Sequence, residues 1–231
     1  MKWLHFAWLN TLRNRRRSLM TLAIAALGTA SILLAGGFAL FTYQALAQSA
    51  ARSSGHLIAA TPAQFSSDED TPLQHGLDDW QALRSKILAD PQVRQVLPRV
   101  EFTGLISNGD KSTVAMAAGI DPDAEFAVKG PFLKIKAGDV LSSTQTLAVM
   151  LGEGLAKNLK VKPGDSLTLL ASTTDGALNA IDVQVQGIFS TGVTEIDKRL
   201  VYTDIATAQK LLATQRVSSL GVFLSSMEAT E

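Results

Sequence analysis

LRNRRRSLMTLAIAALGTASILLAGGFALF, residues 12–41, decides the architecture of this chain, because a cluster of arginines runs directly into an unbroken apolar stretch. No charged residue occurs from Ser18 to Ala51, and the densest apolar part runs from Leu19 to Phe41. A helix over that part would be roughly 34 Å long, which covers a hydrocarbon core of about 30 Å. The stretch therefore predicts a transmembrane helix over residues 18–47.

A cleaved secretory signal is the alternative interpretation of this stretch. Arg15-Arg16 is similar to a twin-arginine signal, and Ala45-Leu46-Ala47 is similar to a small-x-small cleavage site. The apolar region of a secretory signal is typically about 7–15 residues long. Because the run in this chain is clearly longer, it favours an anchor that stays.

The first 17 residues carry five positive charges and no acidic residue. In WLHFAWLNTL, residues 3–12, apolar side chains would cover most of one side of a helix, and two tryptophans come before the arginines. Such a segment is typical of a helix lying in the cytoplasmic interface of a membrane. We predict that residues 1–17 form this interfacial segment, which is seated by Trp3, Phe6 and Trp8 and held by Arg13, Arg15, Arg16 and Arg17. The positive-inside rule then places residues 48–231 on the far side of the membrane, in the periplasm or outside the cell.

Overall composition narrows the function classes. The 231 residues have a formal net charge of zero, but five of the 21 basic residues lie in the first 17, so the remainder holds 16 basic against 21 acidic residues. A mildly acidic body argues against nucleic acid as a partner, because phosphate binding needs a basic face. The chain contains no cysteine, which excludes disulfides and thiolate chemistry.

The sequence of residues 48–231 predicts a mixed α+β domain. The segment 77–90 has a helical apolar face of Trp80, Leu83 and Ile87, with Asp78 or Asp79 as its cap and Pro91 as its stop. Residues 93–121 predict a hairpin around Asn108-Gly109. We expect further strands at 53–60, 146–151, 166–172, 179–191, 199–203 and 218–224, helices over 152–159 and after Asp204, and a loop over 61–76.

No catalytic, cofactor-binding or metal site is predicted. His5, His56 and His75 are isolated and lack the spacing of zinc ligands. The acidic cluster of residues 68–70 lacks the alternating ligands of an EF-hand loop, so a solvated loop is the preferred interpretation. No nucleophile motif of a hydrolase occurs.

One stretch imitates a nucleotide site. TLAVMLGEGLAK, residues 146–157, has the strand-glycine-helix layout of a dinucleotide fingerprint, with Gly152 and Gly154. However, Lys157 stands where the third glycine belongs, and Glu153 would set a carboxylate against the pyrophosphate. We expect the glycines to let the helix start close to the strand.

Three stretches, AGIDPDAEF (118–126), LAVMLGEGLAKNLKVKPGDSLTLL (147–170) and VQGIFSTGVTEIDKRLVYTDIATAQKLL (185–212), occur in an order that resembles the periplasmic core domain of MacB-like and FtsX-like ABC transporter permeases. This group includes the lipoprotein-releasing permeases LolC and LolE. The stretch LRNRRRSLMTLAIAALG (12–28) resembles the start of their first membrane helix.

The resemblance implies a permease with four membrane helices, in the bacterial inner membrane, whose periplasmic domain lies between the first and second helices. It implies a separate ATP-binding subunit, a second permease subunit, identical or not, and mechanical work on lipoproteins or other envelope substrates. These 231 residues hold only the first such helix, so either a fragment of a longer permease or a protein with one span is expected. The alternative function is a scaffold with one span that recruits an envelope partner without transport.

One loop is a candidate contact for a partner. Gly192 and Asp197 lie in STGVTEIDKRL, residues 190–200, between two predicted strands. Binding residues often lie on loops, which favours a partner-contact tip. Glycine and aspartate also occur in turns for backbone reasons, and this second interpretation is the preferred one.

Overall fold

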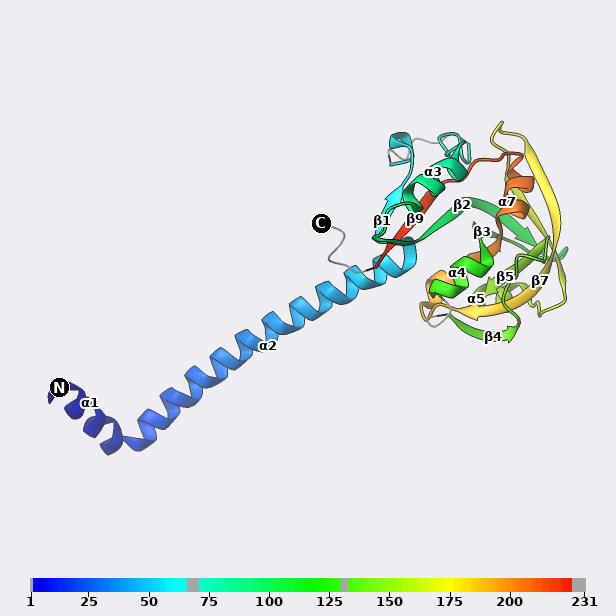
Figure 1. Cartoon of the computed structure of the whole chain (residues 1–231). Coiled ribbons are helices and arrows are strands. Elements are labelled where there is room, and N and C mark those ends of the chain that lie inside the picture. Colours follow the sequence, from blue (N-terminus) through cyan, green and yellow to red (C-terminus); the bar gives the residue numbers. More distant parts are fainter. Residues whose placement is uncertain (1, 66–70, 130–132, 226–231) are drawn as a thin grey trace. The chain divides into compact units, whose positions relative to one another are not determined.

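The computed structural model describes residues 2–65, 71–129 and 133–225 (Figure 1). It divides into an N-terminal unit, residues 1–49, and a compact unit of residues 50–231, which we call the body. The acidic cluster of residues 68–70 lies outside the described residues.

The elements follow one another along the chain as α1 (Lys2–Arg13), α2 (Arg15–Ser54), β1 (Leu57–Ala59), the 3-10 helix η1 (Pro62–Phe65), α3 (Trp80–Leu88), β2 (Val93–Ser107), β3 (Ser112–Ile120), α4 (Pro122–Lys129), β4 (Lys134–Gly138), β5 (Ala148–Gly152), α5 (Glu153–Leu159), β6 (Ser166–Ser172), β7 (Leu178–Ser190), α6 (Thr194–Asp197), β8 (Leu200–Asp204), α7 (Ile205–Leu212) and β9 (Ser219–Leu224). The predicted α+β class is confirmed.

Helix α2 contains the apolar stretch that opens the sequence. Its residues Arg15–Ala51 have a mean hydropathy of 2.0, and by length and composition this segment could cross a membrane. The helix is longer than the predicted 18–47: it begins among the arginines and runs on to Ser54, so the strand expected from residue 53 shrinks to Leu57–Ala59. Gly55 ends the helix with a φ of 105°, a conformation that glycine adopts without strain.

The predicted interfacial segment of residues 1–17 is divided between two helices. Helix α1 ends at Arg13, and Asn14 separates it from α2. The backbone carbonyl of Asn14 accepts a hydrogen bond from Ser18 N over 3.0 Å, which makes Asn14 the first acceptor of α2. Arg15, Arg16 and Arg17 are therefore the first turn of the long helix and are not part of α1.

The strands of the body form one sheet that closes on itself. Strand β2 pairs with β3, β3 with β8, β8 with β5, β5 with β7, β7 with β6, and β6 returns to β2. Strands β9 and β1 extend the sheet beside β2, and β4 extends it beside β7. The register of β2 and β3 pairs Ser107 with Ser112, which confirms the predicted hairpin and its Asn108-Gly109 turn.

The main core fills the inside of this ring. Side chains from alternate positions of the strands meet there with Ala208, Leu211 and Leu212 of α7. Helix α7 packs against β2, β3, β6, β7 and β8 (Figure 1). Asp204 caps α7 as predicted, because its side chain accepts a hydrogen bond from Thr207 N over 2.8 Å.

A smaller core lies outside the ring beneath α4. Phe189 and Tyr202 stack there with ring centroids 5.0 Å apart, and Phe126 of α4 packs against the same cluster. A buried ion pair joins α4 to β2, with 3.0 Å between Arg99 Nη2 and Glu125 Oε1. Burial, together with the nearby Glu125 carboxylate, raises the pKa of Tyr202 to about 12.

Candidate functional site

The end of α2 and the last described strand of the body lie side by side. We call this region the chain junction and define it as residues 51–57 and 221–225. Strand β1, the first strand after α2, pairs antiparallel with the final strand β9, so that Leu57 lies opposite Val222 (Figure 1). Ala51, in the last turns of α2, is buried in the body. The end of α2 is therefore packed at the sheet edge that β1 and β9 form.

His56 holds the two strands of the chain junction together. Its backbone N–H donates to Val222 O over 2.8 Å, and its Nδ1 accepts from Leu224 N over 3.2 Å. The imidazole also meets the Phe223 ring edge-on, with 6.2 Å between centroids. The sequence singled out His56 only as an isolated histidine, because nothing in its neighbourhood along the chain indicates a partner 168 residues away.

Two glycines allow the close approach. A Cβ on Gly221 would lie 2.5 Å from Ser54 O, and a Cβ on Gly55 would lie 2.9 Å from Val222 N. Any side chain at Gly221 would have to push the end of α2 away from β9. The tight fit of the chain junction thus depends on residue types that the sequence alone does not mark as special.

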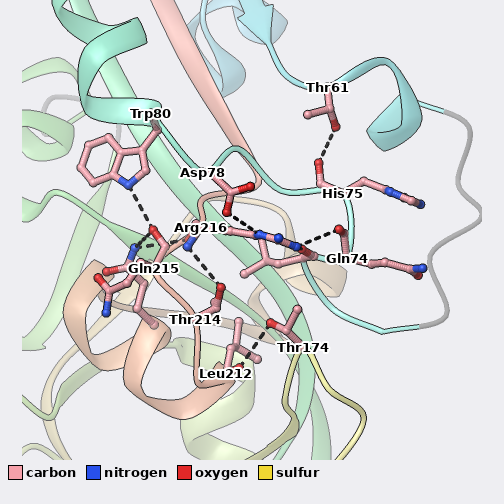
Figure 2. Close-up of polar contacts among 12 residues, drawn as sticks. Thr61, Gln74, His75, Asp78, Trp80, Thr174, Leu212, Thr214, Gln215 and Arg216 are labelled. Carbon is pink, nitrogen blue, oxygen red and sulfur yellow. Dashed lines mark hydrogen bonds and ion pairs between the residues drawn. The ribbon is translucent and has the colours of Figure 1, made fainter.

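A second set of contacts fastens the segment 71–80 to the loop after α7 (Figure 2). Arg216 lies at its centre: Nε is 2.7 Å from Asp78 Oδ1, and Nη1 donates to Gln74 O over 3.0 Å. Trp80 Nε1 donates to Gln215 O over 3.2 Å, and Leu77 forms a bridge with Val217. Asp78 is therefore an ion-pair partner, and Asp79 is the N-cap of α3 without a side-chain hydrogen bond, contrary to the predicted capping role.

The two named residues of the candidate partner-contact loop, Gly192 and Asp197, differ in exposure. Gly192 is exposed, with a φ of 87° and open space around it. The Asp197 side chain is buried and accepts hydrogen bonds from Ser190 Oγ (2.7 Å), Thr191 N (2.9 Å) and Thr191 Oγ1 (2.8 Å). Asp197 is thus a structural residue of the turn, whereas its neighbours Val193 and Ile196 are exposed.

The electrostatics of Asp197 fit this structural role. Burial by itself would raise the pKa of the carboxyl, but the hydrogen bonds from Thr191 and Ser190, helped by the positive charge of Lys136, outweigh it. The pKa of Asp197 is therefore held below its usual value. The carboxylate closes the turn in its ionised form.

The space beside the two glycines of the nucleotide-like stretch is filled by other parts of the protein. A Cβ on Gly152 would lie 2.3 Å from Asp197 O, and a Cβ on Gly154 would lie 2.9 Å from the Lys198 side chain. Helix α5 begins directly after β5, with Gly152 as its N-cap. The space beside these glycines is filled by α6 and Lys198, so they make room for that turn, whereas the sequence predicted that they let the helix start close to the strand.

The N-terminal unit keeps its large side chains exposed. Trp3, Phe6 and Trp8 of α1 are 86%, 67% and 67% exposed, and the arginines at 13, 15, 16 and 17 are exposed as well. A helix N-terminus carries partial positive charge, so three arginines in the first turn of α2 are unfavourable there unless an anionic surface lies close by. Within the described ranges, no group of three or more His, Asp or Glu residues could hold a metal ion.

Comparison with known proteins identifies the family. The family MacB-like periplasmic core domain matches residues 18–231. The lipoprotein-releasing system transmembrane protein LolE of Haemophilus influenzae is 32% identical over 151 residues, covering 63% of this chain and 36% of that protein. The corresponding LolC of Xylella fastidiosa is 30% identical over 158 residues, covering 66% of this chain and 38% of that protein.

Solved structures agree on the fold. The extracellular domain of the noncanonic ABC-type transporter YknZ from Gram-positive bacteria aligns with a TM-score of 0.53 at 15% identity, covering 75% of this chain and 86% of that one. The periplasmic region of MacB from Actinobacillus actinomycetemcomitans aligns with a TM-score of 0.51 at 19% identity, covering 73% of each. The chain spans little more than a third of the curated relatives named above. It belongs to the MacB-like periplasmic core domain family, as its ordered motifs predicted.

Proposed function

We propose that this chain is the membrane-anchored part of a permease component in an ABC transport system, which acts mechanically on lipoproteins or other envelope substrates and is powered by a separate ATP-binding subunit. The family match and the relatives, whose names describe lipoprotein-releasing membrane proteins, support this proposal. The cargo and the ATP-binding subunit are carried over from the resemblance.

The chain junction is the observation that carries the mechanical part of the proposal. Helix α2 continues without a break to Ser54, and its end packs into the body beside β9. A continuous helix can transmit displacement along its axis, whereas a glycine- and serine-rich linker would absorb it as a flexible coil. The last described strand, β9, also pairs with β1, the first strand after α2, which is compatible with a domain placed between two membrane helices.

The proposed location is the bacterial inner membrane. Arg13, Arg15, Arg16 and Arg17 would stay on the cytoplasmic side, according to the positive-inside rule. Trp3, Phe6 and Trp8 would seat α1 in the cytoplasmic interface, and the body would lie in the periplasm. A second permease subunit would complete the pair that the ATP-binding subunit drives.

An insertion experiment tests mechanical coupling directly. The natural full-length protein and its co-purifying ATPase are reconstituted in proteoliposomes, and ATP-dependent release of a fluorescent lipopeptide is measured. Three glycines inserted between Ser54 and Gly55 should abolish release while ATPase binding persists. The control is the same insertion between Asp175 and Gly176, in the exposed turn between β6 and β7.

Each result has a distinct meaning. Release that continues undiminished with the insertion at Ser54 would refute mechanical transmission through the chain junction. If no ATPase accompanies the protein and an envelope partner is recruited without release, the scaffold function takes the place of transport.

A further inference from the structure

A cavity of about 350 Å³ lies where β5, β6 and β7 meet. We call it the polar cavity, because six of its nine lining residues are polar: Gln145, Thr146, Ser166, Asp182, Gln184 and Gln186. Among the residues that line it, Asp182 is the one that carries a charge. The polar cavity therefore offers several hydrogen-bonding groups together with a single negative charge.

The polar residues of β7 reach the cavity because they alternate with core residues. Asp182 and Gln184 are exposed, whereas Val183 and Val185 are buried in the main core. The register of β7 with its neighbour β5 (Figure 1) then shifts, which leaves Gln186 without an opposite residue on β5. A bulge of this kind redirects a side chain, and bulges are over-represented next to active sites.

The backbone beside the polar cavity is held in an unusual conformation. Leu147 has a φ of 58°, in the left-handed region that leucine rarely adopts. Two hydrogen bonds fix it there, since its N–H donates to Thr207 Oγ1 over 3.0 Å and its carbonyl accepts from Gln184 N over 2.8 Å. Strained residues of this kind concentrate at functional sites, which favours a binding role for the cavity that Leu147 borders.

The lining residues carry hydrogen-bond acceptors that the described part of the protein leaves unused. Asp182 Oδ1 accepts from Thr168 Oγ1 over 2.8 Å, but the carboxylate has no ion-pair partner among the described residues. Gln145 Oε1 is buried and has no hydrogen-bond partner there either. Gln184 Nε2 donates to Gly164 O over 3.2 Å, which leaves Gln184 Oε1 as an acceptor. A buried oxygen without a donor is costly, so this set favours a ligand that supplies N–H groups.

We propose that the polar cavity binds a primary ammonium group, with Asp182 supplying the charge and Gln145 and Gln184 supplying neutral acceptors. An ammonium group has three N–H donors and no acceptor, which matches these oxygens. A phosphate or carboxylate ligand is disfavoured, because Asp182 would repel it. No aromatic ring lines the cavity, so a quaternary ammonium group, which is recognised by aromatic cages, does not fit. The proposal is independent of the proposed transport function.

Binding of small amines to the full-length protein tests the polar cavity. The protein is held in maltoside micelles, saturation-transfer NMR is the measurement, and empty micelles give the background. The probes are ethanolamine, ethylene glycol, in which a hydroxyl replaces the amine, and choline, whose nitrogen has no N–H. Ethanolamine should give a saturable signal. Ethylene glycol and choline should bind roughly three-fold more weakly or less, as the loss of one exposed ion pair or its hydrogen bonds implies.

A charge-removing substitution locates the site. Asp182→Asn keeps an oxygen for Thr168 Oγ1 and removes the charge, so it should weaken ethanolamine binding by up to about five-fold. Asp90→Asn is the matched control, because Asp90 is also exposed and its Oδ1 accepts one hydrogen bond, from Gln92 N over 2.8 Å. Asp90 precedes the start of β2, whereas Thr168 pairs with Ser107 at the end of that strand. Asp90→Asn should therefore leave binding unchanged.

A second variant tests the buried acceptor. Gln145→Met has a similar shape but lacks the amide, and it should weaken ethanolamine binding by roughly two- to ten-fold. Gln145 Oε1 has no partner to lose within the described residues, so the denaturant midpoint of this variant should not fall. A loss of binding at unchanged stability then reports on the ligand and not on misfolding.

Three results would overturn the proposal. These are equal binding of ethanolamine and ethylene glycol, binding of choline as strong as that of ethanolamine, and equal effects of Asp182→Asn and Asp90→Asn. The first would mean that the ammonium group is not recognised, and the other two would mean that only diffuse surface charge attracts it. Because binding is measured without ATP or a second protein, each of these results leaves the proposed transport function untouched.

Discussion

The imidazole of His56 accepts a hydrogen bond from the backbone amide of Leu224, with 3.2 Å between Nδ1 and N. Since Nδ1 is the acceptor, the neutral ring carries its proton on Nε2. One side chain just after the long helix thus holds the last described strand of the body in place.

Replacing His56 with alanine should loosen the chain junction. The variant loses one hydrogen bond and the ring contact with Phe223, and we expect a cost of about 1 kcal/mol in the free energy of unfolding. Hydrogen–deuterium exchange at the Leu224 amide should become faster in the full chain. His56→Asn is the matched control, because its amide oxygen can occupy the position of Nδ1. Unchanged exchange at Leu224 in His56→Ala would contradict this role.

Asp197 should make the body sensitive to acid. Its pKa is lowered in the folded state from the usual value of 3.8. The stabilisation is therefore complete above that value and is lost as the pH falls below it toward the lowered pKa, because the unfolded chain then binds the proton more readily. Asp197→Ala should lower the free energy of unfolding by about 1–3 kcal/mol at neutral pH, since Ser190 Oγ and Thr191 N lose their acceptor.

Denaturant unfolding measured at neutral pH and at several values below pH 3.8 checks this dependence on Asp197. The difference in stability between the parent and Asp197→Ala should shrink as the pH falls. Ser190→Ala, which removes one of the hydrogen bonds, should show an intermediate effect. A difference that stays constant across the range would show that the carboxylate charge is irrelevant.

Arg216 and Asp78 should contribute unequally to the free energy of unfolding, although they form one ion pair. The Asp78 side chain is 70% exposed, and exposed pairs contribute about 1 kcal/mol or less. Arg216 also donates to Gln74 O, so Arg216→Ala should cost more, about 1–3 kcal/mol, and should speed amide exchange in residues 71–77. Equal costs for Arg216→Ala and Asp78→Ala would mean that the ion pair alone fastens this segment.

The arginines at positions 13, 15, 16 and 17 should determine the orientation of the anchor. Changing all four to glutamate should impair insertion or invert it, since cytoplasmic positive charge sets membrane orientation. Changing all four to lysine is the control and should leave orientation intact. Protease protection of the body in sealed vesicles is the measurement, and protection that does not change in the glutamate variant would refute this role.

The sequence by itself determined the elements whose causes are local. The apolar run without charges predicts α2, Asn108-Gly109 predicts the turn between β2 and β3, and Asp204 predicts the cap of α7. The alternation of β7 is also visible in the sequence, with Val183 and Val185 buried and Asp182 and Gln184 exposed. Each of these depends on residues a few positions apart, so their pattern along the chain is sufficient.

The tertiary structure alone decided the elements that depend on distant partners. Strand β4 has five exposed residues and no apolar alternation, and it is a strand because it pairs with β7. Helices α4 and α6 are short and were not predicted, and their packing on β2 and β5 comes from the closed sheet. Asp197 reads as a loop residue, yet it is buried because Gly152, 45 positions earlier, leaves room for its backbone. Burial depends on what the fold brings close, and separations of this kind leave no periodic trace in a single sequence.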